Sequence, residues 1–157
     1  MAHSLAQQLN TATQETILAT VTDALAQSEE APFWAEKTVP FVKAIVSVLI
    51  PLREQHLLFT PEGREAQTLT PELFLAWCDL VSLKLLAFTI QESNEAHALK
   101  NTDYDPARCN TYAPISLETL GTYLSGYMIN LENRDDDFPI AHYNLHVGIT
   151  TVVKGML

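Results

Sequence analysis

Apolar residues recur at helical spacing in the C-terminal third of this chain. From position 117 onward they return every three or four residues: Leu117, Leu120, Leu124, Tyr127, Met128 and Leu131. This spacing places all six on one face of an α-helix, and a helix with one apolar face buries that face against other elements. The pattern therefore predicts a fold made of packed helices.

Four further segments carry helical patterns, and no run of strands is predicted. They span residues 13–27, 32–54, 70–88 and 138–157. In the second, Pro40 removes a backbone donor, so either two helices meet near Thr38 or one helix kinks there. Its many Val and Ile residues make a strand the competing interpretation, which the 3.6-residue stripe outweighs. The prediction is an all-α fold, a compact bundle of about five to seven helices.

Two local patterns predict helix starts. Thr11 is followed three residues later by Gln14, which fits a capping box before the first helix. Thr70-Pro71-Glu72 offers a cap residue, a proline in the first turn and an acid at the positive end of the helix dipole. In contrast, residues 91–113 form the longest weakly patterned stretch, and such loops are often functional or disordered.

The charge of the chain limits its partners. The formal net charge is −10 at pH 7, and the nine Lys and Arg residues are scattered without a basic run. Affinity for nucleic acid depends mainly on cations that neutralise phosphates, so we expect only weak DNA contact. No stretch of about 18 apolar residues is present, so no membrane contact is expected. Cys78 is expected to be a small buried residue. Cys109 lies in a polar segment, and no disulfide between the two is expected.

Motifs for catalysis or cofactors are not apparent. There is no Gly-rich phosphate loop, and we expect no catalytic residues and no cofactor in this domain. His142 and His146 lie four residues apart, a spacing that can hold a metal, but both are also expected as ordinary surface or rim side chains of the last helix. Asp135, Asp136 and Asp137 suit a solvated helix start, an acidic recognition patch or, less well, a cation loop.

Partner binding is predicted to involve acidic and aromatic side chains. The candidates are Glu29, Glu30, Tyr104, Asp135, Asp136 and Asp137. Tyr104 lies in a polar stretch and is expected to be exposed. Trp34 could be an exposed anchor, but core packing is the stronger interpretation. Residues 1–12 are expected to be disordered or left over from cloning, and residues 13–157 to form one domain cut from a longer protein.

Several segments, in order, resemble the all-alpha domain of type IV secretion coupling proteins, in the branch found in Dot/Icm systems and I-type conjugative plasmids. They are residues 31–37 (APFWAEK), 39–46 (VPFVKAIV) with 52–53, 69–80 with Trp77, 119–127 (TLGTYLSGY) and 142–157. The chain departs from that pattern at Ser125-Gly126, where a Pro-Gly stop is typical, and residues 92–109 have no counterpart.

The resemblance implies a functional setting. The parent would be a hexameric ATPase of the bacterial inner membrane that feeds substrates to a secretion channel, with its nucleotide site outside this segment. This domain would lie in the cytoplasm and dock relaxase and relaxosome proteins, or effectors and adaptors. Two alternatives remain from the residues themselves. One is a direct DNA-binding helical domain, and the other is a small metal-dependent enzyme centred on His142 and His146.

Overall fold

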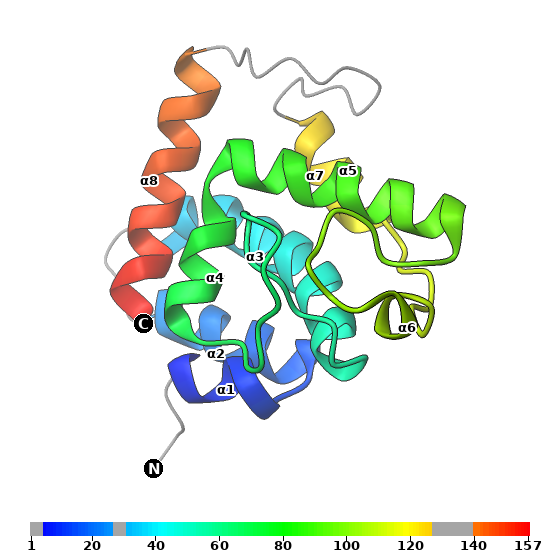
Figure 1. The fold of residues 1–157 in the computed structure, drawn as a ribbon. Helices are drawn as coiled ribbons and strands as arrows, with labels where there is room; N and C mark the ends of the chain where they lie inside the picture. Colours follow the sequence, from blue (N-terminus) through cyan, green and yellow to red (C-terminus); the bar gives the residue numbers. More distant parts are fainter. Residues whose placement is uncertain (1–4, 27–30, 127–139) are drawn as a thin grey trace.

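The computed structural model describes residues 5–26, 31–126 and 140–157, and in these ranges it contains eight helices and no strand (Figure 1). The predicted all-α fold is confirmed. In chain order the helices are α1 (Leu5–Thr11), α2 (Gln14–Ala26), α3 (Ala31–Glu54), α4 (Pro71–Cys78), α5 (Leu80–Ala96), α6 (Pro106–Cys109), α7 (Glu118–Ser125) and α8 (Ile140–Met156). The described helices outnumber the prediction because α1 and α6 were not expected and α5 is separate from α4.

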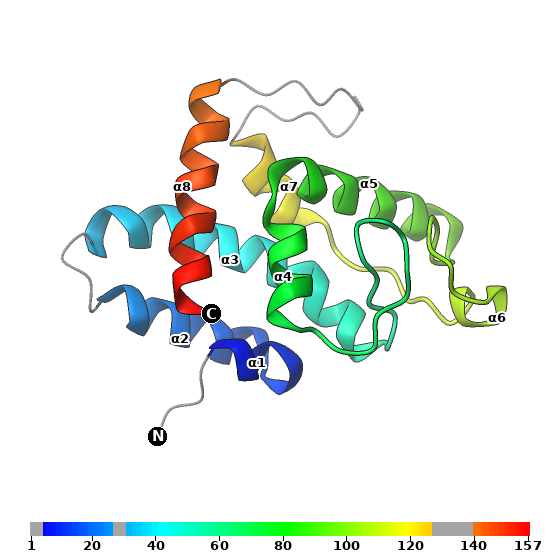
Figure 2. The same cartoon turned by 60° about the vertical axis from the view of Figure 1, so that its left-hand side comes forward.

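Helix α3 runs through the middle of the bundle and packs against α2, α7 and α8 (Figure 2). Nine of its residues are buried apolar side chains: Phe41, Val42, Ala44, Ile45, Val46, Val48, Leu49, Ile50 and Leu52. A helix that is apolar on most of its circumference belongs at the centre of a core. The competing strand interpretation is therefore wrong. One helix continues through Pro40 and Pro51, so the alternative of two helices meeting near Thr38 is wrong as well.

The N-terminal segment is part of the core. Residues 5–11 form α1, and Leu5 and Leu9 are buried. The prediction that residues 1–12 are disordered is wrong for this part, because two apolar residues four apart give even a seven-residue helix a face to bury. Helix α2 is capped by Thr13, whose hydroxyl accepts from the Thr16 amide at 3.2 Å. The predicted capping box from Thr11 is not the one formed.

The segment predicted as one helix from Thr70 to Phe88 is two helices. Thr70 caps α4 as predicted, since its hydroxyl accepts from the Leu73 amide at 3.1 Å. Asp79 then ends α4 and caps α5, accepting from the amides of Val81 and Ser82. The two helices meet at 94°. The apolar rhythm continues across the corner, which is why periodicity alone did not reveal it.

Apart from the short helix α6, the stretch from residue 97 to 117 is irregular, and side-chain hydrogen bonds attach it to the rest of the fold. The side-chain amide of Asn94 donates to the Ile115 carbonyl at 2.7 Å and accepts from its amide at 3.0 Å. Gln55 makes the same two-way pairing with Ala113, at 2.9 and 2.8 Å. These side chains take the place of the backbone pairing that secondary structure would supply.

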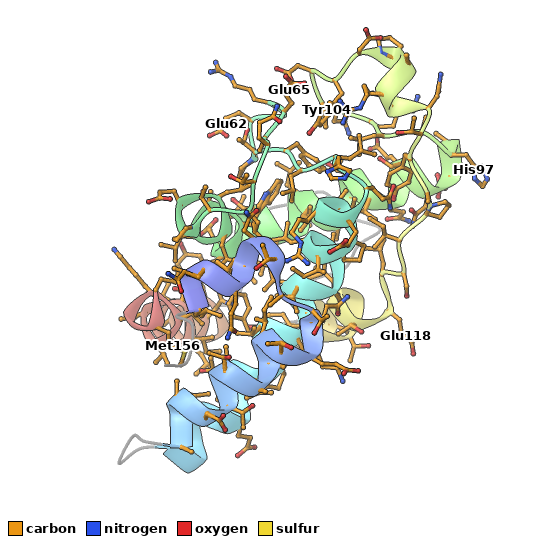
Figure 3. All side chains as sticks on the ribbon, turned by 90° about the horizontal axis from the view of Figure 1, so that it is seen from below. Glu62, Glu65, His97, Tyr104, Glu118 and Met156 are labelled. Carbon is orange, nitrogen blue, oxygen red and sulfur yellow. The ribbon has the colours of Figure 1, made fainter. Side chains whose placement is uncertain are left out.

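Tyr104 contradicts the prediction of an exposed loop aromatic. It is only 7% exposed, and its hydroxyl donates to the Leu58 carbonyl at 2.5 Å. The Arg108 guanidinium lies over its ring, 5.4 Å from the centroid. In Figure 3 Tyr104 lies beside the loop that carries Glu62 and Glu65. The polar neighbours of Tyr104 in the sequence gave no sign that two loops close over it.

The remaining predictions concern the last two helices and the membrane. Helices α7 and α8 lie where two helices were predicted, and the part of the fourth predicted helix beyond Gly126 lies outside the described residues. In the described ranges, no single helix is long and apolar enough to cross a membrane. Only α4 and α5 together meet that length and composition, and they are sharply bent.

Candidate functional site

A groove about 770 Å³ in volume lies between α3, α7 and α8. We call it the α3–α7 groove. Helix α3 lines it with one face, because residues three, four and seven apart share a side of a helix. The α3 residues that line it are Glu36, Lys37, Val39, Pro40 and Lys43.

The opposite side of the groove is formed by α7, with one residue from α8. The lining residues are Glu118, Thr119, Thr122, Tyr123, Gly126 and Leu145. Leu120 and Leu124, on the other face of α7, are fully buried and fix this helix to the core. Buried anchors on one face of a short helix thus determine which residues the other face presents.

The groove has an apolar floor and a charged rim. Val39, Tyr123 and Leu145 are half-buried, whereas Glu36, Lys43 and Glu118 are exposed. Figure 3 shows the Glu118 side chain extending away from the body of the protein at the start of α7. Apolar surface surrounded by a few polar groups is typical of binding sites, and the volume lies in their usual range of about 300–1,000 Å³.

Tyr123 connects the groove to a buried histidine. Its hydroxyl lies 2.9 Å from Nδ1 of His146, which is 1% exposed. On the far side of the ring, Nε2 of His146 lies 2.6 Å from the Cys78 carbonyl oxygen at the end of α4. Burial lowers the pKa of His146, although the hydrogen bond to Cys78 and the charge of Asp79 oppose that effect.

The position of His146 bears on the predicted metal pair. Both of its ring nitrogens are engaged with protein atoms, which leaves no lone pair directed at a metal. The side chain of His142 lies outside what the structure describes. Within the described residues there is no group of three or more His, Cys, Asp or Glu side chains able to hold a metal ion. His146 is buried, so the expectation of an ordinary surface or rim side chain is wrong for this residue.

The structure describes one of the six predicted partner-binding residues. Tyr104 is buried and is not available as an anchor. Glu29, Glu30 and the three aspartates at 135–137 lie outside the described residues, as does the side chain of Trp34. Cys78 is buried as predicted, and both Cys78 and Cys109 are free thiols.

Several cations are used inside the fold. Arg53 donates to the carbonyls of Leu9 and Ala12, and Arg108 donates to the His56 carbonyl. Lys84 is 4% exposed, with its ammonium group 5.9 Å from the Phe88 ring centroid. Arg53 and Lys84 are largely buried and not available to phosphates in solvent, whereas Arg108 remains exposed. The structure therefore reduces the already small set that a DNA-binding face would need.

The groove was not predicted from the sequence. Pro40 was noticed only as a helix breaker, and Tyr123 only within the segment that resembles a coupling-protein helix. A groove forms from two helix faces brought together by the fold, so its signal is split between distant segments. No protein-family model matches this chain, and comparisons with curated proteins and with solved structures found no match either.

Proposed function

We propose that this chain is a protein-docking domain whose α3–α7 groove receives a helical segment of a partner protein. The observation that carries the proposal is the groove itself, an apolar floor with a charged rim between two helices that the core fixes in place. Rigid helices lose little conformational freedom on binding, so such a surface is ready to receive a ligand.

The shape of the groove favours a helical ligand. Its α3 wall runs from Glu36 to Lys43 and its α7 wall from Glu118 to Gly126, which is about 10–12 Å of helix on each side. An amphipathic helix of about two turns would lie along this length, with apolar side chains at positions i, i+3 or i+4 and i+7 on Val39, Tyr123 and Leu145.

The charge of the chain favours a basic ligand. With a net charge of −10, the domain attracts positively charged segments over long range, and complementary charge speeds association and selects partners. Glu36 and Glu118 offer carboxylates at the rim, where basic side chains flanking the apolar face would lie, although Lys37 and Lys43 also line the groove and balance them. The resemblance to coupling proteins supports relaxase, relaxosome, effector or adaptor proteins as the partner class.

The test is binding of full-length candidate partners to the purified domain. The candidates are relaxase, accessory and adaptor proteins of conjugative and secretion systems, and their binding is measured by biolayer interferometry at several salt concentrations. Thr122→Trp should fill the groove and weaken binding at least about tenfold, which corresponds to roughly 1.4 kcal/mol. Ser125→Trp is the matched control, because Ser125 is exposed on the same helix and does not line the groove.

Two results would contradict the proposal. One is the absence of binding to every candidate at low salt. The other is an equal effect of the two tryptophan substitutions, which would place the contact elsewhere. A parallel gel shift with duplex DNA tests the alternative of direct DNA binding, because a phosphate contact must strengthen as salt is lowered.

A further inference from the structure

Three aromatic rings are packed directly behind the wall of the α3–α7 groove. The ring centroids of Phe41 and His146 are 5.0 Å apart at 85°, and those of Phe41 and Tyr123 are 5.5 Å apart at 50°. The third pair, Tyr123 and His146, is 6.0 Å apart. Tyr123 alone among the three lines the groove. Its position is therefore determined from behind, by a ring of α3 and a ring of α8.

The direction of the hydrogen bonds at His146 follows from its partners. The Cys78 carbonyl can only accept, so Nε2 of His146 carries a hydrogen and donates across 2.6 Å. In the neutral imidazole, Nδ1 then has a lone pair, and it accepts from the Tyr123 hydroxyl across 2.9 Å. If His146 gains a proton, Nδ1 becomes a donor, and the Tyr123 hydroxyl must rotate and accept instead. The same two atoms thus form different bonds in the two charge states.

Among the described residues, the ionisable groups known to act on this ring come from two places. The junction of α4 and α5 brings the Cys78 thiol, which donates to the Phe74 carbonyl at 3.2 Å, and the carboxylate of Asp79. Helix α7 brings the Tyr123 phenol, and α3 brings the apolar ring of Phe41. Asp79 favours the charged imidazole, whereas burial disfavours it more strongly.

We propose that His146 is a positioning residue for the α3–α7 groove, and that the neutral imidazole holds Tyr123 in the orientation that forms the groove wall. Protonation of His146 reverses the bond to Tyr123 and thereby disturbs the groove wall that Tyr123 forms. Its consequence for docking, weaker binding at low pH, rests on the proposed function. The effect on the groove itself does not, and it can be measured without a partner.

The test follows the groove and the histidine together by NMR on the whole chain between pH 8 and pH 5. We expect the His146 ring to titrate with a midpoint below 6.5, the usual value for histidine. The backbone amides of Thr122 and Gly126 should shift with that same midpoint. In Tyr123→Phe, which removes only the hydroxyl, His146 should still titrate while these two amides lose that transition.

Two further variants separate this effect from other causes. Glu36 and Glu118 also line the groove and carry carboxylates. The double substitution Glu36→Gln/Glu118→Gln should leave the midpoint shared by His146 and the two amides unchanged. His146→Gln retains an amide donor near the Cys78 carbonyl but cannot titrate, so the Thr122 and Gly126 amides should lose the transition. If that variant fails to fold, the Tyr123→Phe comparison still decides the question.

Three outcomes would overturn the proposal. In the first, the chemical shifts of the groove amides do not change as His146 titrates. In the second, the shifts change in the unmodified chain but not in Glu36→Gln/Glu118→Gln. In the third, the His146 ring stays neutral until the protein unfolds. Failure of the docking proposal gives a different result, because the shared midpoint would persist although no partner binds. If a partner is found, its affinity should fall as pH drops through the His146 midpoint, and this fall should be absent in Tyr123→Phe.

Discussion

Arg53 on α3 donates a hydrogen bond to the carbonyl oxygen of Leu9, 2.8 Å away and 44 residues earlier in the chain. A second bond from the same guanidinium reaches the Ala12 carbonyl at 2.7 Å. Both carbonyls lie at the end of α1, where a helix leaves its last carbonyls without partners. The Arg53 side chain is only 9% exposed. One cation of an acidic protein thus fastens the N-terminal helix to the central one.

Replacing this arginine should destabilise the whole domain. Arg53→Met retains much of the apolar stem but removes both bonds to the α1 carbonyls. Hydrogen bonds from a charged donor contribute about 1.5–3 kcal/mol each, so we expect the loss of two to lower the free energy of unfolding by about 3–6 kcal/mol. Urea unfolding followed by circular dichroism measures this. Arg64→Met, at an exposed position, should change stability by less than about 0.5 kcal/mol. Equal losses would contradict the role of Arg53.

The N-terminal helix should be needed for stability. Leu9 is fully buried in the main core, so Leu9→Ala should cost about 2–5 kcal/mol, as expected for a large-to-small change in a packed interior. Removal of residues 1–12 should cost at least as much and expose apolar surface on α2 and α4. Thermal melts of the two variants against the full chain provide the measurement. An unchanged melting temperature after truncation would restore the view that this segment is dispensable.

The sequence predicted those parts of the fold that depend on contacts close in the chain. The stripe in residues 32–54 predicted α3, and Thr70 was predicted as a cap because its partner, the Leu73 amide, is three residues away. The attachment of α1 could not be predicted in this way, because Arg53 reaches across 44 residues. The corner at Asp79 had a local signal, an acid able to cap a helix, but the continuous apolar pattern on both sides concealed it.

The candidate site was harder to predict for a related physical reason. Its walls come from residues 36–43 and 118–126, and it exists only because the buried face of α7 fits against α3. Tyr104 was predicted to be exposed because its sequence neighbours are polar. It is buried because the fold brings it against a distant segment, where its hydroxyl donates to the carbonyl oxygens of Leu58 and Ala66. Local composition describes the neighbours of a residue along the chain, and both errors concern neighbours in space.

Asp79 should contribute through its cap more than through its charge. Its carboxylate accepts from the amides of Val81 and Ser82 at the start of α5. Asp79→Ala should cost about 1 kcal/mol, whereas Asp79→Asn, which retains a capping oxygen, should cost less than half of that. Chemical unfolding of both variants distinguishes the two. The two substitutions should also lower the His146 midpoint in the same direction, because each removes the nearby negative charge. If Ala and Asn are equally destabilising, the cap is not the source of the effect.

Asn94 should control the order of the segment from residue 97 to 117. It pairs in both directions with Ile115 and also accepts from the Tyr112 hydroxyl. Asn94→Ala removes all three bonds and leaves partly buried groups unpaired, which should cost about 2–4 kcal/mol. Hydrogen exchange should show the largest loss of protection at Ile115 and its neighbours, with α2 affected less. Asn110→Ala, at an exposed position in the same segment, should leave protection at Ile115 unchanged. A uniform loss across all helices would instead indicate that this segment has no separate stability.

The last prediction concerns the stability of the protein in mild acid. Burial lowers the pKa of His146 below its usual 6.5, so in the window between the lowered value and 6.5 the unfolded chain binds more protons than the folded one. By linkage, the free energy of unfolding must then fall as pH drops below about 6.5, and the contribution is fully present above that pH. Urea midpoints measured from pH 8 to pH 5.5 should show this decline in the unmodified chain.

His146→Gln should be less stable at pH 8 yet show a flatter profile, because its side chain cannot take up a proton. His97→Asn provides the control, since His97 is exposed and its left-handed backbone, with φ of 53°, suits asparagine. That control should retain the slope of the unmodified chain, and an identical slope in His146→Gln would show that the decline arises from other groups.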